Sequence, residues 1–293
     1  MPARDHTVTT PDGRALRVRE DGDPDGVPLI AHHGTPGSRL LYERWVEDAT
    51  ERGIRLIAYE RPGYGGSDRH HGRSVADAAA DTEAIADALG LDRFLTQGRS
   101  GGGPHALACA ALLPDRVAAA ATLAGVAPYG ADGLDFLAGM GEDNIEEFNA
   151  ALEGPDKLAP LLEQLTPRIL SADAQELAAA LESLLSPPDV EVISAGFAEE
   201  LIAMAREGIG ERREGWLDDD LAFTRPWGFE LDSITVSVAL WQGRQDLMVP
   251  AAHGEWLAEH IPGVEAVLSA DDGHLSIEHR RIGDVHAWLL ERF

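Results

Sequence analysis

Residues 98–102 read Gly-Arg-Ser-Gly-Gly, and this short segment constrains the fold more than any other part of the chain. It follows a short apolar run and precedes a helix-like run rich in Ala and Leu. Gly-x-Ser-x-Gly between a strand and a helix is typical of a tight turn that exposes the serine hydroxyl above a sheet. Gly98 and Gly102 leave no Cβ where the two backbones approach each other. The pattern predicts that Ser100 is a nucleophile. A flexible glycine-rich loop is the alternative, and a phosphate loop would need a following Gly-Lys-Ser/Thr.

A nucleophilic serine needs a basic partner and an acid that orients this base. At turns of this kind the chain order is Ser, then Asp or Glu, then His. Asp246 follows a strand predicted at 236–241, and His274 follows a strand predicted at 264–268. Because ligands bind at the carboxyl ends of parallel strands, we expect Ser100, Asp246 and His274 to meet at one edge of the sheet.

Four other aspartates compete with Asp246 for the role of the acid. Asp271 and Asp272 precede the histidine too closely to reach its far nitrogen easily. Asp132 and Asp135 follow the preceding predicted strand and are the better rivals. Asp246 is preferred, and these alternatives stay open at this point.

The negative charge that develops during acyl transfer needs two backbone N–H donors. One donor is expected from Gly101, the residue after the nucleophile, at the start of a helix whose first N–H groups are free. The other is expected from Thr35, in the loop after a strand predicted at 27–32. The sequence therefore predicts an oxyanion hole formed by the N–H groups of Thr35 and Gly101.

The first 125 or so residues alternate between strand and helix patterns. Strands are predicted at 8–10, 15–19, 27–32, 54–59, 94–97 and 117–123, and helices at 40–51, 74–89 and 104–113. Such alternation is typical of an α/β fold with a mostly parallel sheet and helices on both faces.

From 128 to 231 helical periodicity dominates. We therefore expect residues 1–127 and 232–293 to form a core domain and residues 128–231 a helical insertion. The acidic run Asp218–Asp220 is interpreted as a solvated face. The large aromatic residues of the insertion are expected mostly to pack its own core, and one or two to line a pocket, with Trp216 and Trp227 as the candidates. These aromatic residues are Phe136, Phe148, Phe197, Trp216, Phe223, Trp227 and Phe229.

Five motifs in register resemble the α/β-hydrolase superfamily, in particular its capped serine-hydrolase branch. They are His33-Gly34-Thr35-Pro36, the run from Glu60 to Asp68, residues 98–102, the run from Gly243 to Pro250, and Gly273-His274. The resemblance implies the α/β-hydrolase fold with a helical cap (lid), no cofactor, and a triad of Ser100, Asp246 and His274. Serine as the nucleophile argues against the dehalogenase and epoxide hydrolase branches, which use aspartate. Arg99 stands where relatives often have His or Trp, so it is expected either to bind an acidic substrate group or to pair with a cap carboxylate.

The function implied is hydrolysis of a small carboxylic ester or a related acyl bond. The cap is expected to determine which substrates bind, and the core is expected to carry out the chemistry. One alternative is a peptidase similar to proline iminopeptidases, in which acidic cap residues bind a substrate ammonium. Against it, residues 33–37 read His-Gly-Thr-Pro-Gly, where those peptidases resemble His-Gly-Gly-Pro-Gly. A second alternative is a ligand receptor that keeps the fold and triad but turns over slowly.

The composition limits the possible partners of the protein and its possible location in the cell. Lys and Arg total 24 against 51 Asp and Glu, a net charge of −27, which repels nucleic acid and anionic membranes. Cys109 is the single cysteine, so no intrachain disulfide is expected. With no apolar leader or long apolar span, a cytoplasmic protein is expected.

The pairs His32-His33 and His70-His71 lack a metal-site spacing, so no metal is expected. The expected partner is a small-molecule substrate, and the oligomeric state stays open.

Overall fold

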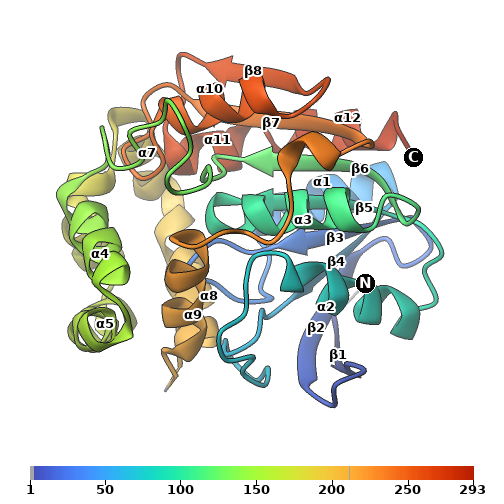
Figure 1. Cartoon of the computed structure of the whole chain (residues 1–293), viewed down its shortest axis with the longest axis horizontal. Helices are drawn as coiled ribbons and strands as arrows, with labels where there is room; N and C mark the ends of the chain where they lie inside the picture. Colours follow the sequence, from blue (N-terminus) through green and yellow to red (C-terminus); the bar gives the residue numbers. More distant parts are fainter. Residues whose placement is uncertain (1–2, 211) are drawn as a thin grey trace.

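The computed structural model describes residues 3–210 and 212–293. Eight strands form one sheet in the order β1-β2-β4-β3-β5-β6-β7-β8 (Figure 1). The strands are β1 (Arg4–Thr9), β2 (Ala15–Gly22), β3 (Val27–His32), β4 (Ile54–Tyr59), β5 (Phe94–Arg99), β6 (Val117–Leu123), β7 (Ser237–Gly243) and β8 (Glu265–Ser269). β2 is antiparallel to β1 and to β4, and the other neighbours are parallel. The predicted mostly parallel sheet is confirmed.

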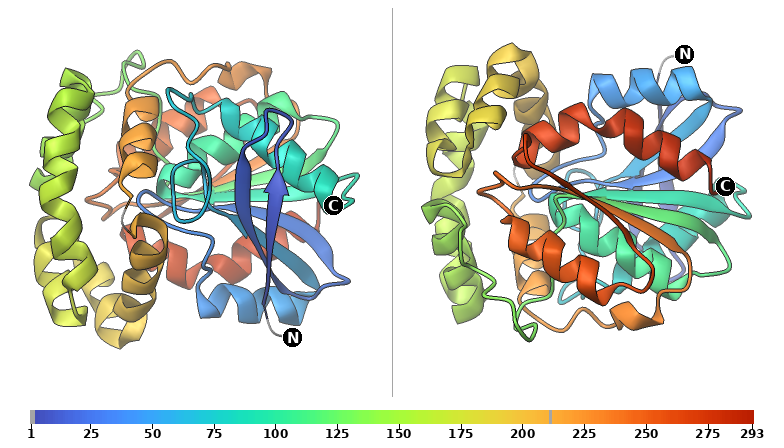
Figure 2. Two further views of the ribbon diagram at one scale, coloured as in Figure 1. Left: turned by 90° about the horizontal axis from the view of Figure 1, so that it is seen from below. Right: turned by 90° about the horizontal axis from the view of Figure 1, so that it is seen from above.

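Helices cover both faces of this sheet (Figure 2). α1 (Glu43–Arg52), α11 (His274–Arg280) and α12 (Ile282–Leu290) lie on one face, and α2 (Asp77–Ala88), α3 (Gly103–Leu112) and α10 (Ala251–His260) lie on the other. The central strands β5 and β6 are buried along their whole length, as expected for parallel strands covered on both sides. This two-faced burial gives two hydrophobic clusters, one on each side of the sheet.

The elements described between β6 and β7 are helical, and they stack against one end of the sheet (Figure 1). They include α4 (Glu142–Glu153), α5 (Pro155–Ser171), α6 (Ala174–Ala180), α7 (Pro187–Val192), α8 (Ala198–Ile209) and α9 (Glu214–Phe223). β6 leads into this insertion, so the insertion lies over the carboxyl ends of the central strands. The arrangement leaves space for a ligand between the insertion and the sheet edge.

The expectation that the insertion's aromatic residues fill its own core is wrong. Phe136, Phe223 and Trp227 are buried in the cluster between the sheet and α2, α3 and α10, and Phe197 is buried in the cluster on the other face. Trp216 packs in the insertion's own cluster, with Leu158, Leu162 and Ile209 among its neighbours. The insertion packs tightly on the core, so most of its large side chains join the two parts instead of filling one.

Among the described residues, no helix combines the length and the apolar character that crossing a bilayer requires.

Candidate active site

Ser100 lies at the sharp corner between β5 and α3. Its φ of 51° is in the left-handed region, which side chains other than glycine rarely adopt. A Cβ on Gly98 would lie 2.8 Å from the amide nitrogen of Gly103, and a Cβ on Gly102 would lie 2.8 Å from the carbonyl carbon of His32. Only glycine fits at 98 and 102, as the sequence pattern predicted. The strained turn exposes Ser100 to a cavity.

Asp246 and His274 form a buried pair. His274 Nδ1 lies 2.8 Å from Asp246 Oδ2, and the histidine is the first residue of α11. The other oxygen of Asp246 accepts the N–H groups of Met248 and Val249, each at 2.8 Å, and Gln242 Nε2 donates to Oδ2 at 3.1 Å. These bonds hold both oxygens of the Asp246 carboxylate in place beside the imidazole.

The rival aspartates lie elsewhere. Asp132 and Asp135 are exposed, and Asp271 is exposed as well. Asp272 is buried, but its carboxylate is bonded to Arg280, Arg281 and Ser269. The structure therefore brings Asp246, of the five candidates, to the imidazole of His274.

Thr35 and Gly101 lie against each other beside the serine. A Cβ on Gly101 would lie 2.9 Å from the Thr35 Cβ and 2.9 Å from Phe223. Gly101 belongs to the one-turn helix Ser100–Gly102 that continues into α3, so its N–H is among the helix's first, unpaired donors. The two predicted oxyanion donors thus come from segments in contact.

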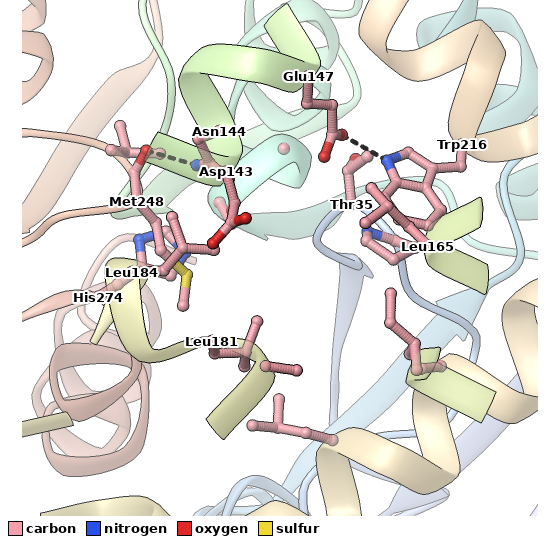
Figure 3. A pocket seen from close by; sticks show the side chains of 18 of the residues that line it. Thr35, Asp143, Asn144, Glu147, Leu165, Leu181, Leu184, Trp216, Met248 and His274 are labelled. Atoms are coloured by element: carbon pink, nitrogen blue, oxygen red, sulfur yellow. Dashed lines mark hydrogen bonds between the residues drawn. The ribbon is translucent and has the colours of Figure 1, made fainter. Parts of the chain in front are cut away.

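Ser100, Thr35, Gly101 and His274 line a common cavity of about 520 Å³, to whose wall the insertion also contributes residues. Figure 3 shows part of this cavity, with Thr35 and His274 on its wall. Its wall is mostly apolar and includes Phe148, Leu165, Leu181, Leu184, Trp216 and Phe223. A cavity of this size and lining suits a small, largely apolar organic molecule.

Of the predicted substrate-binding residues, Arg99 and Trp216 line this cavity, whereas Trp227 does not. The prediction for Trp227 is corrected: its ring stacks on Phe229, 5.8 Å between centroids, and its carbonyl accepts the N–H of Ala76 near the start of α2. Trp227 follows α9 on the path back to β7, where the chain has already left the cavity.

Arg99 is bound by residues outside the helical insertion and not by a carboxylate of the insertion. Its Nη1 donates to Glu278 Oε2 at 3.1 Å, and its guanidinium lies 4.8 Å above the ring of Tyr42. Glu278 belongs to α11, one helical turn after His274. Helix spacing alone places residues four apart on one face, so this carboxylate could have been found from the sequence.

Asp218–Asp220 are buried, so their interpretation as a solvated face is wrong. Asp219 lies among cations: Arg61 Nη2 donates to it at 2.5 Å and Arg73 Nη2 at 2.6 Å. Thr35 Oγ1 also donates to Asp219, at 2.6 Å, and Tyr64 donates at 2.7 Å. Burial alone would raise the pKa of Asp219, but the two arginines hold it well below its usual range. An aspartate of the insertion therefore supports the loop that carries Thr35.

A second carboxylate of the insertion supports the histidine. Asp189 is fully buried, and it accepts the backbone N–H of His274 at 3.0 Å and that of Ser276 at 2.8 Å. The only sequence signal for it is Ser186, three residues earlier, whose hydroxyl also donates to Asp189. Sequence reasoning missed both of these positioning aspartates.

A carboxyl pair lies in the wall of the cavity. Trp216 Nε1 donates to Glu147 Oε1 at 2.6 Å (Figure 3), and Asp220 lines the same cavity. Burial and then the neighbouring charge of Glu147 raise the pKa of Asp220, and burial raises the pKa of Glu147. Two carboxyl groups that share a site favour holding one proton between them.

The electrostatics of His274 depart from those of a free histidine. Burial alone would lower its pKa, but the Asp246 carboxylate and then those of Glu278 and Asp189 outweigh burial and raise the pKa to about 9. The imidazole is therefore protonated near neutral pH.

Known proteins resemble this chain in sequence and in fold. The sequence pattern of the family described as "alpha/beta hydrolase fold" matches residues 27–280. A non-heme chloroperoxidase of Streptomyces lividans is 35% identical over 148 residues, which are 50% of this chain and about half (54%) of that protein. A pimeloyl-[acyl-carrier protein] methyl ester esterase of Nitrosomonas europaea is 27% identical over 85% of this chain and 89% of that protein. The crystal structure of an esterase from Rhodococcus sp. ECU1013 superposes with a TM-score of 0.70 at 21% identity, over 99% of both chains, and this likeness is one of fold.

Proposed function

The chain belongs to the alpha/beta hydrolase family, and from that premise we propose that it is a serine esterase acting on small carboxylic esters. The proposal is carried by one observation: Ser100 lines the same cavity as His274, whose Nδ1 lies 2.8 Å from Asp246. The similarity to a relative named as a methyl ester esterase also supports the proposal.

In the proposed mechanism, Ser100 Oγ attacks the ester carbonyl carbon while His274 Nε2 takes the hydroxyl proton. The carbonyl π electrons move to the oxygen, and the N–H groups of Thr35 and Gly101 bind the resulting oxyanion. The tetrahedral intermediate collapses, the C–O bond to the alcohol breaks, and His274 gives the proton to the leaving oxygen. Water then attacks the acyl-enzyme with His274 again as base, and the acid and free Ser100 are released. Asp246 keeps the imidazole in the correct tautomer throughout.

The experiment is turnover of p-nitrophenyl esters by the wild type and Ser100→Ala, together with labelling by a fluorophosphonate probe. We expect labelling at Ser100 alone and a loss of about 10⁶-fold in kcat in Ser100→Ala, the scale seen when such a nucleophile is removed. Labelling that persists in the folded variant would overturn the proposal. A burst without steady turnover would instead indicate a slowly turning receptor on the same fold.

A second candidate, an aminopeptidase or aminoacyl esterase, is favoured by the carboxyl pair Glu147 and Asp220 in the cavity wall. A carboxylate beside the indole of Trp216 suits a substrate ammonium. An aminoacyl arylamide panel separates the two: the second function predicts turnover of free-amine substrates, none of their N-acetylated forms, and loss of that preference in Glu147→Gln.

A further inference from the structure

Glu278 is a second carboxylate beside the imidazole of His274. It is fully buried on α11, and its Oε1 lies 3.8 Å from His274 Nε2, on the opposite side of the ring from Asp246. Among the described residues Oε1 has no hydrogen-bond partner, although it is buried. A buried carboxylate oxygen without a donor is costly, so its position next to the imidazole requires a physical reason.

The rest of Glu278 is held firmly. Its Oε2 accepts bonds from Arg99 Nη1 at 3.1 Å and from the Tyr42 hydroxyl at 3.3 Å, and its carbonyl accepts the indole N–H of Trp45 at 3.0 Å. These contacts direct the other oxygen, Oε1, toward the histidine. In the described structure no hydrogen bond joins Ser100 to His274. The carboxylate that forms an ion pair with His274 Nε2 is that of Glu278, at 3.8 Å.

We propose that Glu278 is a positioning residue for His274: its Oε1 competes with Ser100 for the imidazole Nε2 and stabilises the protonated ring. The inference rests on the proposed role of His274 as the base. When the ring carries a proton on both nitrogens, one N–H faces Asp246 and the other faces Glu278. Nε2 accepts the serine proton only after it has lost its own.

The other charged groups around His274 fit this assignment. Asp189 on α7 accepts the backbone N–H and not the ring, and Arg99 at the end of β5 contacts Glu278. The insertion contributes further charged residues to the same cavity, namely Asp143, Glu147, Arg168 and Asp220. Of all these groups, Asp246 and Glu278 form ion pairs with the ring itself. Both of these carboxylates raise the pKa of His274.

The test is the pH dependence of kcat/KM for p-nitrophenyl acetate in the wild type, Glu278→Gln and a matched control. Glu278→Gln keeps the size and an acceptor for Arg99 but removes the charge. An opposite charge within about 4–6 Å shifts a pKa by about 1 unit or more. The acid limb of the pH profile, where activity is lost because His274 becomes protonated, should therefore move down by about one pH unit in Glu278→Gln. At pH 7 that is a gain of about tenfold in kcat/KM relative to the wild type. A purely structural role for Glu278 would give a loss at every pH.

Asp48→Asn is the control, because Asp48 pairs with another histidine, His286, at 2.7 Å on α1 and α12. We expect its acid limb to coincide with that of the wild type. If Glu278→Gln does not fold, Glu278→Asp keeps the charge and draws it back from the ring, so its acid limb should lie slightly below that of the wild type.

An acid limb that stays in place in Glu278→Gln, or in Glu278→Asp where only that variant folds, would overturn this inference while leaving the esterase proposal intact. Failure of the esterase proposal is recognised separately, by fluorophosphonate labelling that survives Ser100→Ala.

Discussion

Asp189 of the helical insertion accepts the backbone N–H of His274 in the core domain, at 3.0 Å. The two lie so close that a Cβ on Gly273, the residue before the histidine, would lie 2.7 Å from the Asp189 carboxyl carbon. Together with the bond from Thr35 to Asp219, this contact means that the insertion holds both the loop of the proposed base and the loop of the proposed oxyanion hole. The expected division, with chemistry in the core and selectivity in the cap, is therefore incomplete.

Asp189→Ala should impair the chemistry as well as the fold. It removes an acceptor shared by two N–H groups and two hydroxyls, at a cost of about 1–3 kcal/mol in the free energy of unfolding. A loosened His274 should slow fluorophosphonate labelling. Asp173→Ala is the control, since exposed Asp173 caps α6 of the same insertion. That variant should lose about 1 kcal/mol of stability and label at the wild-type rate. Equal labelling by both variants would contradict the assigned role of Asp189.

Asp246→Asn should lower kcat by about 10⁴-fold, because an amide favours the wrong tautomer of the imidazole. Asp132→Asn and Asp135→Asn change exposed carboxylates and should leave kcat unchanged. Steady-state kinetics on one p-nitrophenyl ester compares the three variants directly. A damaging Asp132 or Asp135 variant would show that the acid has been assigned to the wrong residue.

The pH profile should differ from that of an ordinary histidine base. His274 must be neutral to accept the serine proton, and its pKa is raised to about 9. Activity is therefore lost as pH falls below about 9, and at pH 7 about 1% of the rings are neutral. We expect kcat/KM, corrected for spontaneous hydrolysis, to keep rising between pH 7 and 9. A plateau already reached at pH 7.5 is the result that would count against this.

Thr35→Val should weaken the proposed oxyanion hole. It keeps the shape of the side chain but removes the bond of 2.6 Å to Asp219 that holds the loop. Removing an oxyanion donor outright costs about 10²–10³-fold in kcat, so a displaced donor should cost about tenfold to 10²-fold. Thr35→Ser restores the hydroxyl and should recover most of the rate. If valine and serine variants lose kcat equally, the hydroxyl does not position this loop.

Trp216→Ala should change the ranking of acyl chain lengths toward longer chains, because Trp216 forms part of the cavity wall. Trp227→Phe changes a buried side chain outside the cavity and should leave the ranking as in the wild type. A series of p-nitrophenyl esters of increasing chain length gives the comparison. A Trp227 variant that alters the ranking would place that residue in the substrate path after all.

Local patterns determined much of the site. The strand predicted at 117–123 coincides with β6, and the segment at 98–102 forms the predicted corner. Asp246 and His274 were predictable because each follows a strand directly, and parallel strands bring their carboxyl ends to one edge. Even Glu278 was within reach, since residues four apart share a helix face.

What the sequence could not determine is which charges become buried and against what. Asp219 was interpreted as solvated because it lies in a run of three aspartates, yet it pairs with Arg61 and Arg73, which precede it by 158 and 146 residues. Asp189 is separated from His274 by 85 residues. A run of charged residues is stable either in water or beside opposite charges, and the sequence of the run does not show which of the two environments it has. The partners of Asp189 and Asp219 are brought to them only when the insertion packs onto the rest of the chain. Which residues become partners depends on distances in the folded protein, and local periodicity does not encode these distances.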